Sequence, residues 1–302
     1  MIPRLKSRQP IASETSAFMQ TLLESGFEGE IAGDQATRTV LSTDNSIYQM
    51  TPEACVFPKH HADLVRVMRA ASEHSGVTLF PRGGGTGTNA QSLGEGVIVD
   101  TSRHMNRILE VNLEERWARV ECGVVKDHLN AQIRAEGLFF APDTSTSNRA
   151  TIGGMINTDA SGQGSCQYGK TRDHVLSMRA VLLTGETLET SVISDEELDA
   201  LPESSTESRI GRALRSLHDE NLDEIEAAFP VLNRCLTGYD LKHVRTTDGD
   251  IDLNAVLCGS EGTLGLISEA TINLEPLPTE IGLVAVQYES FMDALFDARE
   301  LM

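Results

Sequence analysis

The stretch FPRGGGTGTNAQ, residues 80–91, constrains the fold of this chain more than any other feature of its sequence. It places four glycines in the five positions 83–87. Consecutive glycines tolerate positive φ and allow backbone N–H groups to converge on an anion without a Cβ in the way. A hairpin turn explains one or two glycines but explains this density poorly. The stretch therefore favours a backbone cradle for an anion such as a phosphate.

A nicotinamide-dinucleotide fingerprint is the obvious rival, because Gly85-x-Gly87-x-x-Ala90 fits its looser form. That fingerprint must open a helix whose N-terminus holds the pyrophosphate. Here only QSLGEG, residues 91–96, separates the loop from an apolar strand at 96–100. No crossover helix fits in that space, so the context excludes this rival.

Bulk composition excludes several other classes of protein. The formal net charge of −20 argues against general nucleic-acid binding, because a phosphate backbone would be repelled. No apolar run approaches the roughly 18 residues of a membrane span, and no secretory peptide precedes the first helix. The five cysteines (Cys55, Cys122, Cys166, Cys235 and Cys258) form no CxxC pair, which argues for a reducing compartment. We expect a cytoplasmic chain without a metal site, and leave open peripheral contact with the inner face of the membrane.

Hydrophobic periodicity predicts an α+β arrangement. Predicted helices cover 13–24, 61–74, 124–137 (ended by Gly137) and much of 195–230, and predicted strands cover 54–58, 77–81, 96–100, 107–112, 117–123, 176–184 and 187–191. A further strand is predicted after the glycine turn near 259–265. The last twenty residues read as a strand followed by a helix that runs to residue 302. A helix without a Gly or Pro stop predicts a chain cut inside its next domain.

Two more glycine-rich segments follow the first. TIGGMINTDASGQG, residues 151–164, brackets a predicted short helix at 155–160 whose N-terminus could face an anion. Taken alone, it is read better as an ordinary loop. GSEGTLGLISEATINL, residues 259–274, joins a glycine turn to an amphipathic strand and alone indicates nothing specific.

Taken in order, RGGGTG, TIGGMINTDASG, YGKTRDHVLSMRAVLLTGE and GSEGTLGLISEA resemble the FAD-binding domain of the vanillyl-alcohol-oxidase (PCMH-type) flavoproteins. The resemblance covers about residues 44–274. It implies an α+β fold with a PCMH-type FAD-binding domain of two α/β subdomains, followed by the start of a truncated substrate (cap) domain. The implied parts are an N-terminal helical segment (1–45), the FAD-binding domain (46–276, with subdomains about 46–140 and 141–276) and the start of the cap domain (277–302).

The resemblance also implies which residues bind the cofactor. In such proteins the first glycine loop wraps the FAD pyrophosphate with backbone amides, and the later segments approach the pyrophosphate, the ribose, the isoalloxazine edge and the adenine. The residues implied are Arg82, Gly83, Gly84, Gly85, Thr86, Gly87, Thr88, Pro142, Asp143, Thr144, Gly153, Gly154, Asn157, Ser161, Gly162, Tyr168, Gly169, Glu261, Gly262 and Ile267. Members with a covalent flavin often carry His where this chain has Thr86, so noncovalent FAD is expected.

A closer resemblance concerns the substrate. STDNSIYQ, APDTSTSNRATIGG and LTGYDLKHV look like the large bacterial D-2-hydroxyglutarate dehydrogenases, which join a flavin module to an iron–sulfur module. This resemblance implies oxidation of a D-2-hydroxy acid to its 2-oxo acid by hydride transfer to FAD. The electrons would pass on to a quinone, a cytochrome or an electron-transferring flavoprotein. An iron–sulfur cluster is expected only if a further C-terminal part resembles the family.

No catalytic residue is assigned from the sequence, because the family's catalytic histidines and substrate-binding basic residues belong to a C-terminal half. His60, His61, His104, His128 and His174 are candidates by residue type only, and surface or loop-anchoring roles are the better interpretation of each. Three alternatives stay open: a D-lactate or glycolate dehydrogenase, a flavin oxidase of another alcohol class, and an isolated chain that only binds FAD.

Overall fold

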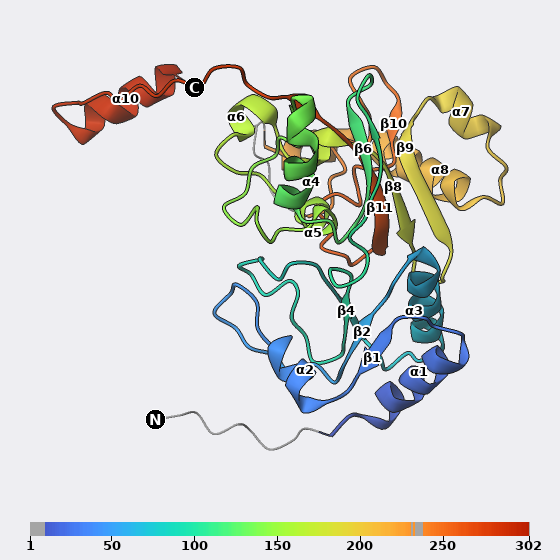
Figure 1. The fold of residues 1–302 in the computed structure, drawn as a ribbon. Coiled ribbons are helices and arrows are strands. Elements are labelled where there is room, and N and C mark those ends of the chain that lie inside the picture. The colour runs from blue at the N-terminus through green and yellow to red at the C-terminus, as the bar shows by residue number, and fades with distance from the viewer. Residues whose placement is uncertain (1–9, 231, 233–237, 302) are drawn as a thin grey trace, which may run out of the picture.

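The computed structural model describes residues 10–230, 232 and 238–301 of the chain. They form two lobes, each built on its own β-sheet, with the N-terminal part of the chain in the lower lobe of Figure 1. Helices and strands are mixed throughout, which confirms the predicted α+β class. The predicted subdomain boundary near residue 140 stays a prediction; the sheets themselves change between Asp100 and Ile108.

The lower lobe contains a four-stranded sheet in the order β1-β2-β4-β3, in which β2, β4 and β3 run parallel. β2 and β4 are buried at every position, which explains why ACVF and VIVD are nearly continuous apolar runs. The elements of this lobe are α1 (Ser13–Glu24), β1 (Glu30–Ala32), α2 (Gln35–Val40), β2 (Ala54–Phe57), α3 (His61–Glu73), β3 (Leu79–Arg82) and β4 (Val97–Asp100).

The upper lobe contains a six-stranded antiparallel sheet in the order β10-β9-β8-β11-β6-β5. Its strands are β5 (Ile108–Asn112), β6 (Trp117–Glu121), β8 (Val175–Val181), β9 (Thr187–Ile193), β10 (Ile251–Asp252) and β11 (Leu266–Asn273). β11 pairs with β8 on one side and with β6 on the other. A separate short pair joins β7 (Leu138–Phe139) to β12 (Glu275–Pro276).

Short helices surround the upper sheet. They are α4 (Lys126–Ile133), a 3-10 turn (Arg134–Glu136), α5 (Ile152–Asn157), α6 (Ser165–Tyr168), a second 3-10 turn (Thr171–His174), α7 (Asp195–Ala200), α8 (Thr206–Glu220) and α9 (Leu222–Ala228). In Figure 1, α7 and α8 lie beside β9, away from α4, α5 and α6. None of the helices in the described part of the chain is both long enough and apolar enough to cross a membrane.

One buried apolar cluster runs through both lobes. It includes Leu64 and Val67 of α3 and Val99 of β4 together with Met178 of β8 and Ala270 of β11. α3 also packs directly against β8 and β11. The lobes are therefore joined by a packed core, and a cavity between them has fixed walls.

Several local expectations are confirmed. α1 spans residues 13–24 as predicted, and α3 begins at the predicted His61. Gly137 takes a left-handed conformation with φ of 72° where the fourth helix ends. Residues 83–96 contain only turns and bends, so no crossover helix follows the glycine loop.

The strand predicted near residues 282–290 is wrong. This segment has no strand, and Ile281, Leu283 and Val284 are 89%, 96% and 85% exposed. A strand needs a neighbour to accept its backbone hydrogen bonds, and among the described residues none pairs with this segment. The predicted helix after it exists as α10 (Phe291–Leu301), which buries no residue.

Candidate functional site

The glycine loop continues directly from β3 and is half-buried between the lobes. The backbone N–H groups of residues 83–88 have no hydrogen-bond acceptor in the described part of the chain. Buried or half-buried backbone donors normally find a partner. The loop therefore presents a row of unpaired donors, as an anion cradle requires.

Close approach of two segments explains the glycines at the start of this loop. A Cβ on Gly84 would lie 2.0 Å from the Arg149 carbonyl oxygen, and one on Gly83 would lie 2.2 Å from Thr151 Oγ1. Gly85 has φ of 63°, which disfavours any other residue. The loop is thus pressed against residues 149–151, the start of the second glycine segment.

The Arg82 side chain packs against the loop, since a Cβ on Gly85 would lie 2.5 Å from its Nη2. Its Nη2 donates to the Thr43 carbonyl oxygen at 2.8 Å, and its Nη1 lies 3.4 Å from Ser92 Oγ. Burial lowers the pKa of Arg82, while Asp100 and Asp44 act in the opposite direction. Some of the N–H groups of Arg82 therefore bond to the protein and are not available to a ligand. The main role of Arg82 is to position the loop.

The second glycine segment forms α5, one turn earlier than predicted. Thr151 caps this helix by accepting a hydrogen bond from the Gly154 N–H at 3.2 Å, so both glycines lie inside its first turn. Gly153 is required by packing, because its Cβ would lie 2.6 Å from Cys122 Cβ. Burial raises the pKa of the Cys122 thiol to about 12, so this neighbour is an uncharged thiol.

Asn157 ends α5 with an unsatisfied acceptor. Its Nδ2 donates to the Gly153 carbonyl oxygen at 2.8 Å, while its Oδ1 is buried and has no partner. A buried orphan acceptor costs free energy unless a ligand or water supplies a donor. Asn157 is therefore a candidate contact for a ligand that carries both donors and acceptors.

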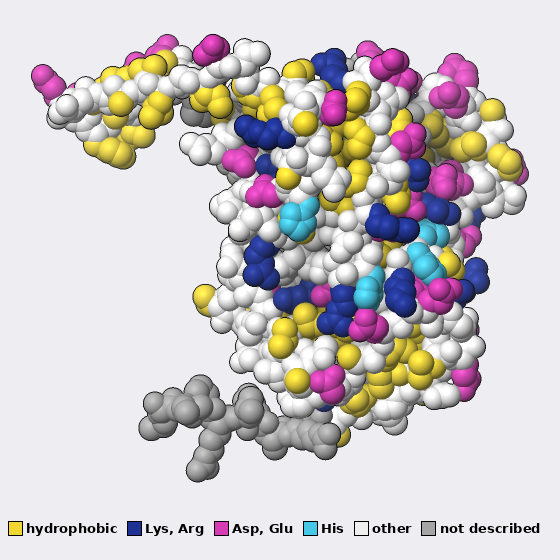
Figure 2. Space-filling view, viewed as in Figure 1, with side chains coloured by type: hydrophobic (Ala, Val, Ile, Leu, Met, Phe, Trp, Pro, Cys, Tyr) yellow, Lys and Arg dark blue, Asp and Glu magenta, His cyan; other side chains and the backbone are white. Residues whose placement is uncertain are grey.

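These segments enclose one cavity of about 1370 Å³, its open mouth included. Its walls come from the glycine loop, residues 144–161 and residues 261–267, that is, from both lobes. Figure 2 shows Lys, Arg and His side chains gathered in a band across the waist between the lobes, although the chain is acidic overall. The waist is locally more basic than the rest of this face.

Most of the residues implied by the sequence line this cavity. They are Arg82, Gly83, Gly84, Gly85, Thr86, Gly87, Thr88, Thr144, Gly153, Gly154, Asn157, Ser161, Glu261 and Ile267. The remaining implied residues lie outside the lining: Pro142, Asp143, Gly162, Tyr168, Gly169 and Gly262. Gly262 packs against the lining residue Pro81, and Gly162 packs against the Asp143 carbonyl oxygen.

Sequence reasoning missed several lining residues. They are Pro81, Gln91, Ser92, Thr101, Cys122, Ser145, Thr146, Ala150, Thr151, Met155, Thr158, Ala160, Gly265 and Leu266. Some of them, such as Thr146 and Thr151, stand inside the motifs already singled out. Thr101 and Cys122 follow strand ends far away in the sequence, and only the pairing of the strands brings them to the cavity.

The candidate histidines do not converge on the cavity, whose lining contains none of them. His174 is buried and contacts the Tyr168 carbonyl oxygen through Nε2, while His104 and His60 lie against Glu30 and Glu28. No group of three or more His, Cys, Asp or Glu side chains in the described residues could hold a metal ion. The four described cysteines are free, and Cys235 lies outside the described residues.

A buried ion cluster stands behind the 158–161 wall. Asp159, with φ of 44°, forms an ion pair with Lys170 and accepts a hydrogen bond from the Arg172 N–H at 3.1 Å. Arg172 also pairs with Asp240, against which His243 lies. The cluster holds the strained Asp159 backbone in place between two lining residues, Thr158 and Ala160.

Comparison with known proteins gives the following relationships. Residues 52–191 match a family described as "FAD binding domain". Two curated relatives, each named D-2-hydroxyglutarate dehydrogenase, are 55% identical (Pseudomonas putida, 100% of this chain) and 49% identical (Escherichia coli, 99% of this chain). The chain spans only 30% of the length of each. A solved alkyldihydroxyacetonephosphate synthase shares the fold over 93% of this chain and 43% of its own, with a TM-score of 0.65 and 21% identity.

Proposed function

We propose that the cavity between the lobes holds FAD, in keeping with the match of residues 52–191 to a family described as "FAD binding domain". The observation that carries the proposal is the row of unpaired backbone N–H groups in residues 83–88. A pyrophosphate offers several acceptor oxygens and suits such a row. The orphan Asn157 Oδ1 supports the same ligand, because a flavin ring carries a donor as well as acceptors.

The residues of this chain bind and orient the cofactor in this proposal. The glycine loop would hold the pyrophosphate, α5 and Asn157 would approach the rest of the molecule, and Leu266 with Ile267 would give an apolar wall. FAD, when bound, supplies the two-electron acceptor of the reaction. Thr86 cannot form a histidyl link, and the protonated Cys122 thiol is a poor nucleophile, so both support a noncovalent flavin.

We further propose that the chain is the flavin-binding part of a D-2-hydroxyglutarate dehydrogenase. The support is the 55% and 49% identity over essentially the whole chain. The reaction would oxidise a D-2-hydroxy acid to its 2-oxo acid and pass the electrons to a quinone, a cytochrome or an electron-transferring flavoprotein. A cytoplasmic location, with or without contact with the inner membrane face, stays part of the proposal.

D-lactate and glycolate chemistry are the second candidates. A D-lactate dehydrogenase of Anaerostipes hadrus is 26% identical and the GlcD subunit of a Bacillus subtilis glycolate oxidase is 30% identical over most of this chain. Their lower identity favours D-2-hydroxyglutarate as the first substrate to test. The chain by itself is expected to bind FAD without turning over any of these acids.

A titration with FAD tests the first proposal. The purified chain should bind FAD, turn yellow, and release all of the flavin to the supernatant on acid precipitation. A colourless chain whose FAD fluorescence titration is flat would refute the proposal, and flavin that stays with the precipitate would refute noncovalent binding. Turnover is tested on the longest gene product that contains this chain, with D-2-hydroxyglutarate, D-lactate and glycolate as substrates. Higher kcat/KM for either of the last two would reassign the substrate.

A further inference from the structure

His61 joins the two lobes through its side chain. It is the first residue of α3, and its Nδ1 lies 2.9 Å from Ser268 Oγ on β11. Its Nε2 lies 2.9 Å from Thr187 Oγ1 on β9. One imidazole from the lower lobe therefore contacts two strands of the upper sheet.

The hydrogen-bond chain fixes the proton of this imidazole. Ser268 Oγ donates to the Arg179 carbonyl oxygen at 2.9 Å, at a register shift between Ile267 and Glu269 in the β8–β11 pair. A hydroxyl has one proton, so towards His61 the Ser268 oxygen accepts and the proton sits on Nδ1. The Nε2 lone pair then accepts from the Thr187 hydroxyl. In this arrangement His61 is neutral and each of its ring nitrogens has a hydrogen-bond partner.

The same contacts lead directly to the cavity. Ser268 is completely buried and follows Leu266 and Ile267, which line the cavity wall. In the other direction, α3 is followed by β3, whose end carries the glycine loop. His61 is thus linked to the β11 wall of the cavity through Ser268, and its helix precedes the strand that carries the glycine loop.

We propose that neutral His61 is a positioning residue, which sets the β11 wall of the cavity against the glycine loop and makes FAD affinity depend on whether the imidazole is protonated. The inference rests on the proposed binding of FAD. It assigns His61 no contact with the cofactor and no part in the chemical step.

The charges around His61 favour its neutral form. Burial lowers its pKa most, Arg179 of β8 and the neighbouring His60 lower it further, and Glu269 of β11 opposes them. Arg179 is partly offset by Glu189 of β9 at 3.5 Å and by Glu269 at 3.6 Å. On α3 itself, Asp63 and Arg66 pair with each other, and Arg69 packs against Gly185 in the β8–β9 turn.

The direction of the pH effect follows from this lowered pKa. The neutral contact is complete above the ordinary histidine value of about 6.5 and is lost as the pH falls through the lowered value. Protonation adds a proton to Nε2, so the Thr187 hydroxyl must turn from donor to acceptor, and it places a positive charge near Arg179. FAD should therefore bind more weakly at acidic pH.

The test measures the FAD dissociation constant between about pH 8 and pH 5.5 for four forms of the chain. The unchanged chain should lose about threefold in affinity over this range, because the lowered pKa of His61 leaves the imidazole only partly protonated at pH 5.5. His61→Gln, which can donate and accept but cannot titrate, should bind within about threefold of the unchanged chain at pH 8 and show a flat profile. His61→Leu should bind about tenfold more weakly at pH 8, since about two hydrogen bonds are lost, and should also be flat.

His60→Gln is the matched control, because His60 caps α3 through the Asp63 N–H and contacts Glu28 rather than the upper lobe. It should keep a pH-dependent affinity of the same size, with its midpoint slightly higher because a neighbouring positive charge is removed. Thermal unfolding of the FAD-free forms distinguishes a positioning role from a merely structural one. A merely structural role would lower the melting temperature of His61→Leu but leave the pH profile of its FAD affinity parallel to that of the unchanged chain. That result, or pH profiles that are the same in all four forms, would overturn the inference while leaving FAD binding intact.

An unchanged chain that binds no FAD at any pH would instead overturn the proposed function, and the inference with it.

Discussion

At the residue scale, the glycines of the first loop answer different physical demands. Gly83 and Gly84 are required by close packing, because atoms of residues 149–151 would lie within 2.2 Å of an added Cβ. Gly85 is required by its own φ of 63°. Both demands keep the backbone close to residues 149–151 and leave its N–H groups free. The density of glycine in the sequence therefore reflects a contact between two segments as well as a binding surface.

Gly84→Ala tests this geometry. Its Cβ would lie 2.0 Å from the Arg149 carbonyl oxygen, so the loop that carries the unpaired donors must move. Overpacking of this kind costs about 1–3 kcal/mol, and we expect FAD affinity to fall about 10- to 100-fold in a fluorescence titration. Gly282→Ala is the control, because nothing lies within 4 Å of its Cβ, and it should bind FAD normally. Equal affinity of Gly84→Ala and the unchanged chain would remove the loop from the site.

Asn157→Leu tests the orphan acceptor. The substitution removes the unpaired Oδ1 together with the bond to the Gly153 carbonyl oxygen, so the free energy of unfolding without FAD should change by no more than about 1 kcal/mol. FAD affinity should fall about tenfold, because a contact to a donor of the ligand is lost.

Asn130→Leu is the matched comparison for this prediction. Asn130 bonds the Phe140 N–H at 2.7 Å and the Phe140 carbonyl oxygen at 3.2 Å, so both ends of its amide are used within the protein. Its loss should cost about 1–3 kcal/mol of unfolding free energy and leave FAD affinity unchanged. If instead Asn157→Leu destabilises the chain equally and binds FAD normally, Asn157 is structural.

At the scale of elements, the sequence predicts most of the helices and turns that depend only on the residues within one segment. α1 and α3 carry apolar residues at helical spacing, and Gly137 supplies the left-handed stop, so their prediction succeeds. The start of α5 is set by the Thr151 cap, whereas the sequence predicts a helix that begins about one turn later, after the two glycines. The segment at 282–290 has strand-like composition but no neighbour among the described residues, and composition cannot supply one.

The residues of the candidate site likewise fall into those that a local motif indicates and those that only the folded structure brings to the cavity. The order of the glycine motifs indicates the loop and α5, and these segments do meet at one cavity. Thr101 and Cys122 reach it only through the pairing of β-strands and the path of the chain after them. The sequence around these two residues is typical of the end of any strand, so it does not indicate that they line a cavity.

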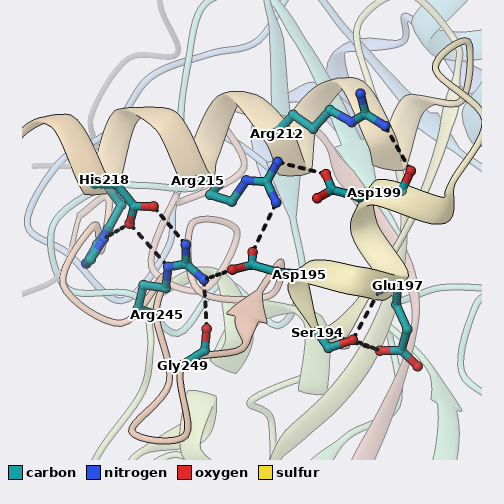
Figure 3. Close-up of polar contacts among 10 residues, drawn as sticks. Ser194, Asp195, Glu197, Asp199, Arg212, Arg215, His218, Arg245 and Gly249 are labelled. Carbon is teal, nitrogen blue, oxygen red and sulfur yellow. Dashed lines mark hydrogen bonds and ion pairs between the residues drawn. The ribbon is translucent and has the colours of Figure 1, made fainter.

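An ion-pair network ties α7, α8 and the segment before β10 together (Figure 3). Arg245 lies 2.7 Å from Asp219 and 3.0 Å from Asp195, while Arg215 bridges Asp195 and Asp199. Arg245 is the main cause that lowers the pKa of Asp219 to about 2. The network therefore stabilises the fold above the ordinary Asp value of about 3.9 and loses that contribution as the pH falls towards 2.

Arg245→Met is expected to remove this contribution. Asp219 is 47% exposed, so solvent screening keeps the loss small, about 1 kcal/mol at pH 7, and smaller still in 0.5 M salt. Urea unfolding at pH 7 and near pH 2.5 should show a difference between the two chains that shrinks at the lower pH. A difference that is independent of both pH and salt would indicate lost packing of the Arg245 stem.

At the scale of the whole molecule, an acidic chain of net charge −20 is proposed to bind an anionic cofactor. The repulsion is offset locally by unpaired backbone donors on one wall of the cavity and by Arg82, the one Lys or Arg side chain among the described residues of its lining. The cavity has walls from both lobes, and the lobes share one core. A ligand held there stabilises the junction between them as well as the loop that it touches.

This arrangement predicts how cofactor and substitutions combine in thermal unfolding. FAD at 100 times its dissociation constant should add about 2.7 kcal/mol of stability to the unchanged chain and raise its melting temperature. Gly84→Ala should lose about half of that increment or more at the same FAD concentration, because its binding is weakened about 10- to 100-fold. Arg245 pairs with residues of α7 and α8 and does not line the cavity, so Arg245→Met should lower the melting temperature equally with and without FAD. The double variant should then show the two effects added, since the sites share no contact. A cofactor increment that Arg245→Met also abolishes would mean that the α7–α8 region and the cavity unfold as one coupled unit, and that the network in Figure 3 acts on the site.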